Sequence, residues 1–212
     1  MIHFEGAGAQ REATHFKNRV LDLVDTFAKK QPSSPLIIRL ISPLVDLIVG
    51  ASSDEQQLSD KAKGILRSRI GNYKQLPSDV ETDKVSALLA DIHMRARRAH
   101  SADLVGVLNH CSVYLSKTLL CLDGEKSVLQ IYRLSLTDFI TRKNSALNTN
   151  FFQDFIRYCP TSAWRLREDL LDLSTRAVNS YRQCQVYQLV EVLVNQLPVM
   201  VCTSFIHLNM CY

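Results

Sequence analysis

The most restrictive feature of this sequence is a stretch that would be apolar almost all the way round a helix. Residues 36–49 read LIIRLISPLVDLIV, and the run is interrupted at Arg39, Ser42, Pro43 and Asp46. A helix that is apolar on several sides must be buried on more than one of them. At 1.5 Å per residue its length is about 21 Å, too short for a membrane span of about 20 residues. The stretch therefore needs neighbours on both sides, as stacked helical hairpins provide.

A Pro-Ser-Ser-Pro elbow joins this stretch to a preceding amphipathic helix at residues 14–29. Its apolar residues recur at helical spacing and are predicted to face inward: Phe16, Val20, Leu23, Val24 and Phe27. In the elbow, Ser34 suits a helix cap and Pro35 suits the first helical position, where an N–H would be unpaired anyway. Pro43 is expected to kink the second helix or to divide it, with Ser42 as a second cap.

The rest of the chain repeats the helical pattern. Apolar spacing predicts further helices over residues 55–70, 85–100, 101–119, 128–140, 151–159, 162–173 and 175–197. With these seven, nine helical segments are predicted. Ser78 and Glu81 form a capping box just before the segment at residues 85–100. No segment shows the alternation typical of strands, and seven Gly and six Pro are few for a sandwich or barrel with many tight turns.

The predicted fold class is therefore all-α, with about eight to nine helices of about 12–20 residues joined by short loops. Degenerate helix pairs favour an armadillo- or HEAT-like solenoid, whose repeats run about 40–47 residues, and an irregular helical bundle is the alternative. We expect a flexible leader at residues 1–13, a repeat-like helical domain at 14–198 and an atypical tail at 199–212. The tail belongs to a stretch from 192 that lacks Asp, Glu, Lys and Arg, which suggests a truncated or mis-spliced end.

The sequence lacks the common motifs of catalytic sites. The sequence has no Gly-x-Ser-x-Gly, no His-Glu-x-x-His and no glycine-rich loop after a strand. Its six Cys form no Cys-x-x-Cys pair, so we expect reduced thiols, several of them buried, and no zinc. Asp22 and Asp25 share a helix flank, but a solvated flank is the better interpretation than a two-metal site. We assign no catalytic residue, metal ligand, cofactor, small-molecule substrate or membrane segment.

Basic clusters are the remaining candidates for a binding site. They comprise Arg67 and Arg69, then Arg95, Arg97 and Arg98, then Arg142 and Lys143. In the simpler interpretation they are solvated and stabilise helix C-termini by about 0.3–1 kcal/mol each, with an Asp91–Arg95 pair at i, i+4. In the functional one, they form a ridge of a solenoid that contacts phosphates or an acidic partner. Tyr and Phe are placed on inward faces, so such contacts would be directed at the nucleic-acid backbone.

Several segments resemble one known family. Residues 15–50 (HFKNRVLDLVDTFAKKQPSSPLIIRLISPLVDLIVG) are similar to a segment of the nucleolar proteins called DNA polymerase phi or Myb-binding protein, and in fungi DNA polymerase V. The resemblance continues in LSDKAKGILRSRI, YRLSLTDFITRKNSALNTNFFQDFIRYCP and AVNSYRQCQVYQLVEVLVNQLP, and covers about residues 14–198. It implies an all-α, armadillo-like part of the C-terminal third of a nuclear, nucleolar protein. No catalytic motif of the family falls in this segment.

Three functions follow from these observations. The preferred one is a non-enzymatic nucleolar scaffold in ribosomal RNA gene transcription and ribosome biogenesis, as the resemblance implies. Its partners would be transcription or ribosome-biogenesis proteins, with ribosomal DNA or RNA bound through phosphate contacts. The alternatives are a DNA-directed DNA polymerase, as the family name suggests, and a generic helical protein-interaction module.

Overall fold

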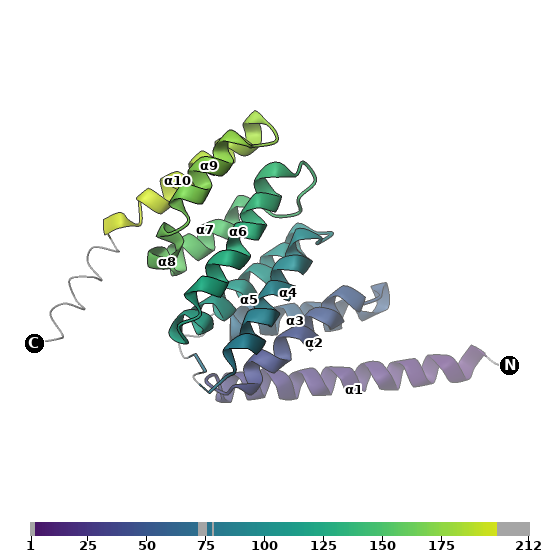
Figure 1. Ribbon diagram of the computed structural model, residues 1–212. Helices are drawn as coiled ribbons and strands as arrows, with labels where there is room; N and C mark the ends of the chain where they lie inside the picture. Colours follow the sequence, from purple (N-terminus) through teal and green to yellow (C-terminus); the bar gives the residue numbers. More distant parts are fainter. Residues whose placement is uncertain (1–2, 72–75, 78, 199–212) are drawn as a thin grey trace, which may run out of the picture. The chain divides into compact units, whose positions relative to one another are not determined.

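The computed structural model describes residues 3–71, 76–77 and 79–198, and every regular element within those ranges is a helix (Figure 1). The predicted all-α class is confirmed. The described residues form ten α-helices, one more than the nine predicted segments. The difference arises because residues 162–173 were expected as one helix. They instead contribute to α8 (Pro160–Trp164) and α9 (Arg167–Thr175), which a short break separates.

The chain forms two compact units, Met1–Glu81 and Thr82–Tyr212, where the sequence suggested one domain over residues 14–198. The first helix, α1 (His3–Lys30), already includes residues 3–13, which were expected to be a flexible leader. Both Ser78 of the predicted capping box and the tail at 199–212 lie outside the described residues.

The first unit is built around α2 (Leu36–Gly50) and the helical segment that follows it. That segment consists of a short 3₁₀ turn, η1 (Ser53–Glu55), then α3 (Gln56–Gly64) and a π-helix, η2 (Ile65–Ile70). α2 packs against α3, and α1 packs against α3 and η2. The expected burial of α2 is confirmed for five of its residues, which are Ile37, Ile38, Ile41, Leu44 and Val45.

The start of α2 lies one residue later than predicted: Pro35 is the N-cap residue and makes no side-chain cap hydrogen bond, although Ser34 before it contacts the first turn. The backbone N–H of Leu36 donates to Ser34 Oγ at 3.3 Å, and the N–H of Ile37 donates to the Ser34 carbonyl oxygen at 3.0 Å. The expected division at Pro43 is wrong, because α2 runs unbroken from Leu36 to Gly50 with Pro43 inside it. Buried residues on both sides of the proline hold the two halves in the core, which compensates for the one hydrogen bond that proline cannot donate.

α1 turns a different face to the core from the one that its apolar spacing suggested. Leu21 and Ala28 are buried, whereas Phe16, Val20 and Leu23 are 69%, 40% and 70% exposed. Ion pairs hold α1 in this rotation, since Lys17, Asp22 and Asp25 pair with residues of the segment that follows α2. Their partners are Glu55 at 2.5 Å, Lys61 at 2.7 Å and Arg69 at 2.7 Å. The prediction that Phe16, Val20 and Leu23 face inward is therefore wrong.

The second unit stacks helices that alternate in direction (Figure 1). They are α4 (Thr82–Arg97), α5 (Ala102–Cys121), α6 (Glu125–Thr141), α7 (Thr149–Tyr158), α8, α9 and α10 (Ser180–Val194). α5 packs against α4, α6 and α7 and lies at the centre of this unit. Among the described helices, α5 alone has the length and apolar composition of a membrane span, and 67% of its apolar window is buried inside the protein.

Replacing Pro43 tests whether the proline shapes the packing of α2. The Pro43 side chain is exposed, so Pro43→Ala removes no buried contact and restores a backbone donor. We expect the free energy of unfolding of the first unit to rise by about 1–2 kcal/mol, less than the roughly 3 kcal/mol cost of proline inside a helix. Thermal unfolding followed by circular dichroism measures this change. A lower melting temperature would show that the packing of the core depends on the proline.

Candidate functional site

Three connections of the second unit return on the same side of the stack (Figure 1). They are residues 98–101 between α4 and α5, 142–148 between α6 and α7, and 176–179 between α9 and α10. The connection between α9 and α10 contacts the end of α6, because the N–H of Val178 donates to the Ile140 carbonyl oxygen at 3.0 Å. Arg182 Nη2 also reaches the Ser145 carbonyl oxygen at 3.5 Å. We call these three connections together the loop edge.

Each helix that starts at the loop edge has a side-chain cap. Ser101, Asn148 and Asn179 accept hydrogen bonds from the backbone N–H three residues later, at 3.2, 3.1 and 2.8 Å. Polar residues of these types are favoured there because they satisfy one of the unpaired donors of the first turn. The starts of α5, α7 and α10 therefore lie along this edge. Helix N-termini carry partial positive charge, but α4, α6 and α9 end at the same edge, and the partial negative charge of their C-termini offsets it.

Basic side chains give the loop edge its positive charge. Arg97 and Arg98 lie at the end of α4, Arg142 and Lys143 follow α6, and Arg176 follows α9. Arg98 and Lys143 are exposed, and neither forms an ion pair with another residue that the structure describes. The structure thus places two of the three predicted basic clusters on one edge. Arg176 joins them although the sequence did not single it out, because only the fold brings its loop beside Ile140.

Some of the predicted basic residues have an evident structural role. Arg95 Nε pairs with Asp91 Oδ2 at 2.7 Å, as the i, i+4 spacing predicted. Arg142 pairs with Asp138 at 2.8 Å, and the Asp138 side chain is only 8% exposed. Asp138 also accepts a hydrogen bond from Ser145 Oγ at 2.7 Å, so this carboxylate fixes the shape of the α6–α7 loop. The loop that carries Lys143 is therefore held from within.

Arg67 and Arg69 belong to the π-helix η2 of the first unit, not to the loop edge. Arg69 makes a two-pronged contact with Asp25, with nitrogen–oxygen distances of 2.7 and 3.4 Å. That contact orients α1, which gives Arg69 a role in folding. Asp22 and Asp25, which were weighed as metal-binding carboxylates, are thus both ion-paired. Among the described residues, no group of three or more His, Cys, Asp or Glu could hold a metal ion.

The prediction that Tyr and Phe all lie on inward faces is wrong. Tyr158, Tyr181 and Tyr187 are exposed, and so is Phe16. Tyr181 is 69% exposed and lies in the first turn of α10, two residues after the cap Asn179. α10 buries Val186, Leu189 and Leu193, which leaves its first turn outside the core. An aromatic ring is consequently available next to the basic residues of the loop edge.

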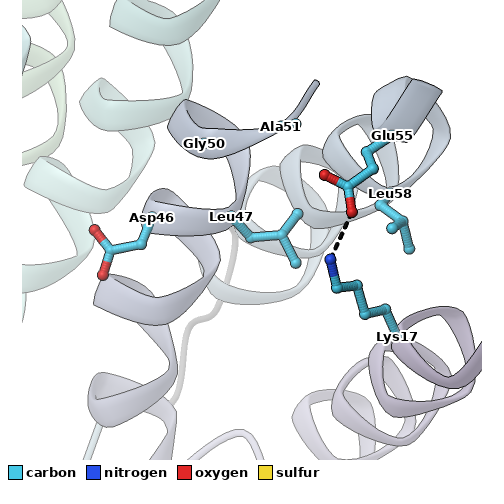
Figure 2. A pocket seen from close by; sticks show the side chains of 7 residues that line it. All are labelled: Lys17, Asp46, Leu47, Gly50, Ala51, Glu55 and Leu58. Atoms are coloured by element: carbon cyan, nitrogen blue, oxygen red, sulfur yellow. Dashed lines mark hydrogen bonds and ion pairs between the residues drawn. The ribbon is translucent and has the colours of Figure 1, made fainter. Parts of the chain in front are cut away.

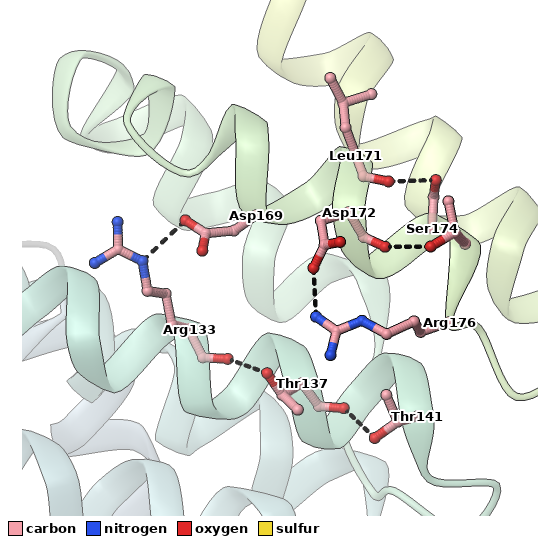
Figure 3. A network of polar contacts seen from close by, with 9 residues as sticks. Arg133, Thr137, Thr141, Asp169, Leu171, Asp172, Ser174 and Arg176 are labelled. Carbon is pink, nitrogen blue, oxygen red and sulfur yellow. Dashed lines mark hydrogen bonds and ion pairs between the residues drawn. The ribbon is translucent and has the colours of Figure 1, made fainter.

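A polar contact network on the outer face of α6 sets the position of α9 and hence of Arg176 (Figure 3). Arg133 Nε donates to Asp169 Oδ2 at 2.9 Å, which ties the two helices together. Thr137 and Thr141 donate to carbonyl oxygens one turn earlier, at 2.9 and 2.7 Å, so their hydroxyls stay on α6. Arg176 itself pairs with Asp172, four residues before it on α9.

The core of the second unit contains a buried histidine, His93, on α4. It is 1% exposed, and its two ring nitrogens lie 2.8 Å from Ser135 Oγ and 2.8 Å from Ser112 Oγ. Ser112 Oγ lies a further 2.8 Å from the Tyr132 hydroxyl, and the imidazole packs edge-on against the rings of Tyr132 and Phe151. Burial, aided by the charge of Arg97, lowers the pKa of His93 to about 3. His93 is thus a core histidine, neutral and hydrogen-bonded at both ring nitrogens.

The buried thiols behave as core groups. Burial raises the pKa of both Cys111 and Cys159 to about 12, so these thiols stay protonated and unreactive at neutral pH. Both lie in the core, as expected for several of the cysteines, while Cys121 and Cys184 are exposed. All four are free thiols.

Two hollows open on the surface. In the first unit, a hollow of about 290 Å³ lies among α1, α2 and α3, with Leu47 and Leu58 on its wall and the Lys17–Glu55 ion pair across its side (Figure 2). In the second unit, a more polar hollow of about 420 Å³ is lined by charged residues of α6 and α9, including Arg133 and Arg167. Arg133 pairs with Asp169 and Arg167 with Glu168, so both arginines are already engaged within the unit.

The stacked helices define an all-α helical-repeat protein. The comparisons agree: the model of the family described as Myb-binding protein 1A-like, TPR repeats, matches residues 31–204. The chain belongs to this family. An all-α solenoid fits both the stacked helices and the repeats of the family. No solved structure gives a significant match.

The relatives carry regulatory names. The chain is 26% identical over 148 residues to the rDNA transcriptional regulator pol5 of Schizosaccharomyces pombe, a match that covers 69% of this chain and 15% of that protein. It is 26% identical over 188 residues to a Myb-binding protein 1A-like protein of Danio rerio, covering 80% of this chain and 15% of that one. It is 27% identical over 183 residues to Myb-binding protein 1A of Rattus norvegicus, a match that covers 68% of this chain and 14% of that protein. The chain thus spans about one seventh of the length of these curated relatives, which are named as regulators or binding proteins and not as enzymes.

His93 predicts a pH dependence of stability. Its pKa in the folded chain is far below the ordinary value of 6.5, so the unfolded chain binds more protons and acid favours unfolding. The stabilisation is complete above pH 6.5 and is lost as the pH falls from there towards 3. Between pH 7 and 5.5 we expect a loss of about 1 kcal/mol, from 1.36 kcal/mol per pKa unit. Urea unfolding at both pH values measures it. His93→Gln, which does not titrate, should flatten the dependence; an equal slope in the variant would contradict this origin.

Proposed function

We propose that this chain is a non-enzymatic helical scaffold of a nucleolar factor that controls ribosomal RNA gene transcription and supports ribosome biogenesis. Membership of the repeat family and the regulatory names of the relatives support this proposal. The observation that carries the molecular part is the loop edge, where three loops, three helix N-termini and exposed cations lie together. Repeat arrays present such edges as extended binding surfaces.

The loop edge suits a polyanion that runs along it. Arg98 and Lys143 are exposed and come from different loops, so they offer separate charges rather than one point of attachment. The backbone N–H groups of helix starts bind phosphate oxygens well, and an exposed ring such as Tyr181 can stack on an unpaired base. We infer that the edge contacts the backbone of ribosomal DNA or of a ribosomal RNA. Such contacts position a scaffold without reading sequence.

An acidic segment of a transcription or ribosome-biogenesis protein is the second candidate for this edge, because carboxylates meet the same cations. The two candidates differ in their salt dependence. A nucleic acid releases condensed counterions when its phosphates are neutralised, so its affinity falls much more steeply with salt.

A polymerase activity, the third function considered, would need carboxylates that hold two metal ions. Asp22 and Asp25 are instead engaged with Lys61 and Arg69. Nucleotide incorporation that persists in an Asp22→Ala, Asp25→Ala, Asp46→Ala variant would come from a contaminant. Incorporation lost only in that variant would revive the enzymatic function.

Fluorescence anisotropy with a labelled random-sequence duplex, and with a single-stranded RNA of equal length, tests the proposal. Two phosphate contacts alone would weaken binding by about tenfold between 50 and 200 mM salt. The variant Arg98→Glu, Lys143→Glu should bind at least about tenfold more weakly at 50 mM and show a shallower salt dependence. Neither residue has an ion pair with a described residue, so the fold should be preserved.

A matched control changes the same charges elsewhere on the second unit. Lys126 and Arg165 are exposed and lie near the start of α6 and between α8 and α9, away from the loop edge. Arg165 pairs with Glu125 at 3.1 Å, so this variant must also keep its helical circular dichroism unchanged. Lys126→Glu, Arg165→Glu should therefore retain most of the binding. Equal losses in both variants would mean that net charge, not the loop edge, drives binding.

Absence of binding to either nucleic acid would leave the acidic protein partner. Exclusion from nucleoli of a longer chain that contains this segment would contradict the proposed compartment.

A further inference from the structure

α1 carries an apolar stripe on the side that faces away from the core. Phe16, Val20 and Leu23 are strongly exposed, and Phe27 is half-buried in line with them. With 3.6 residues per turn, these four side chains fall within about 60° of one another on the helix surface. Their spacing of four, three and four residues is that of a seam between two packed helices. An isolated exposed leucine needs no explanation, but a continuous stripe of this length indicates a partner.

The stripe cannot be reburied by rotating α1 within its own unit. Leu21 and Ala28 lie about 120° round the helix from the stripe and are buried. On that same side, Lys17 Nζ lies 2.5 Å from Glu55 and Asp25 lies 2.7 Å from Arg69. A rotation that covers Phe16 and Leu23 would break these ion pairs and expose Leu21. The rotation is thus fixed, and whatever covers the stripe must come from outside the unit.

Charges beside the stripe indicate which helix would fit. Glu12 and Lys30 are both exposed and lie at its two ends, 18 residues apart, on the same flank. Arg19 lies between them on that flank. A helix that runs parallel to an identical copy would place Glu12 against Glu12 and Lys30 against Lys30. An antiparallel copy places Glu12 of each chain beside Lys30 of the other, which forms two opposite-charge pairs related by a two-fold axis.

The same antiparallel register matches the apolar residues. It sets Phe16 of each copy opposite Phe27 of the other, and Val20 opposite Leu23. Large and small side chains then fill the seam symmetrically. We propose that two copies of this chain form an antiparallel dimer through the stripe on α1. This dimer would place two loop edges on one particle, a consequence independent of what those edges bind.

Sedimentation equilibrium of the intact chain over a range of concentrations tests the dimer. We expect reversible association to twice the 24.0 kDa monomer mass. Leu23→Glu puts a charge in the centre of the seam and should leave a monomer at every concentration. The matched control is Leu134→Glu on α6, where a leucine that is 56% exposed has no apolar stripe around it. The control should dimerise like the unchanged chain.

Charge reversal tests the direction of the two helices. Glu12→Lys alone and Lys30→Glu alone each turn both attractive pairs into repulsive ones, so each should weaken dimerisation by roughly five- to tenfold. The combined Glu12→Lys, Lys30→Glu variant restores opposite charges across the interface and should return to the original dissociation constant. In a parallel pair, neither single change would alter the sign of the interaction.

Three results would overturn the proposal. One is a monomer at all concentrations, which would assign the stripe to a helix of a different protein or to another part of a longer chain. Another is a dimer that survives Leu23→Glu, which would place the interface elsewhere. The third is failure of the combined charge variant to recover while its helical circular dichroism is unchanged. None of these results affects nucleic-acid binding by the loop edge, because α1 and that edge belong to different units.

Discussion

The second unit depends on satisfying one imidazole that has no access to water. His93 stands on α4, its hydrogen-bond partners stand on α5 and α6, and the ring of Phe151 from α7 covers it. An unpaired polar group at this depth would cost about 1–3 kcal/mol, so both nitrogens must find their serines. That requirement fixes how far α4, α5 and α6 can slide along one another. A shift of one helical turn would leave Ser112 or Ser135 out of reach.

The register fixed at His93 has an effect at the ends of the helices. With α4 and α6 side by side and parallel, their C-terminal residues come to the same side of the unit, and so do the starts of α5 and α7. Buried Asp138 then shapes the loop after α6, and the contact between Val178 and Ile140 brings in the loop after α9. The loop edge is thus a product of packing in the core. The exposed charges on it, Arg98 and Lys143, take no part in that core.

The first unit shows the same relation between fixed contacts and a free surface. Ion pairs from α1 to Glu55, Lys61 and Arg69 select one rotation of the helix, although apolar side chains exist on two of its sides. Surface ion pairs are individually weak, at about 0–1 kcal/mol, but three along one helix act in the same direction as the burial of Leu21 and Ala28. The cost of that choice is an exposed stripe, which becomes available for association.

Features that depend on neighbours in the chain were predicted from the sequence. They include the all-α class, the burial of α2 and the Asp91–Arg95 pair, because spacing along a single helix determines each of them. Only the tertiary structure decided which side of α1 is buried, that residues 162–173 break between α8 and α9, that Tyr181 is exposed and that Arg98 and Lys143 lie on one edge. Periodicity shows that an apolar stripe exists, but the residue that covers it comes from elsewhere in the chain. For the same reason the sequence alone did not indicate that His93 is buried. Its burial follows from the packing of α4 against α5 and α6.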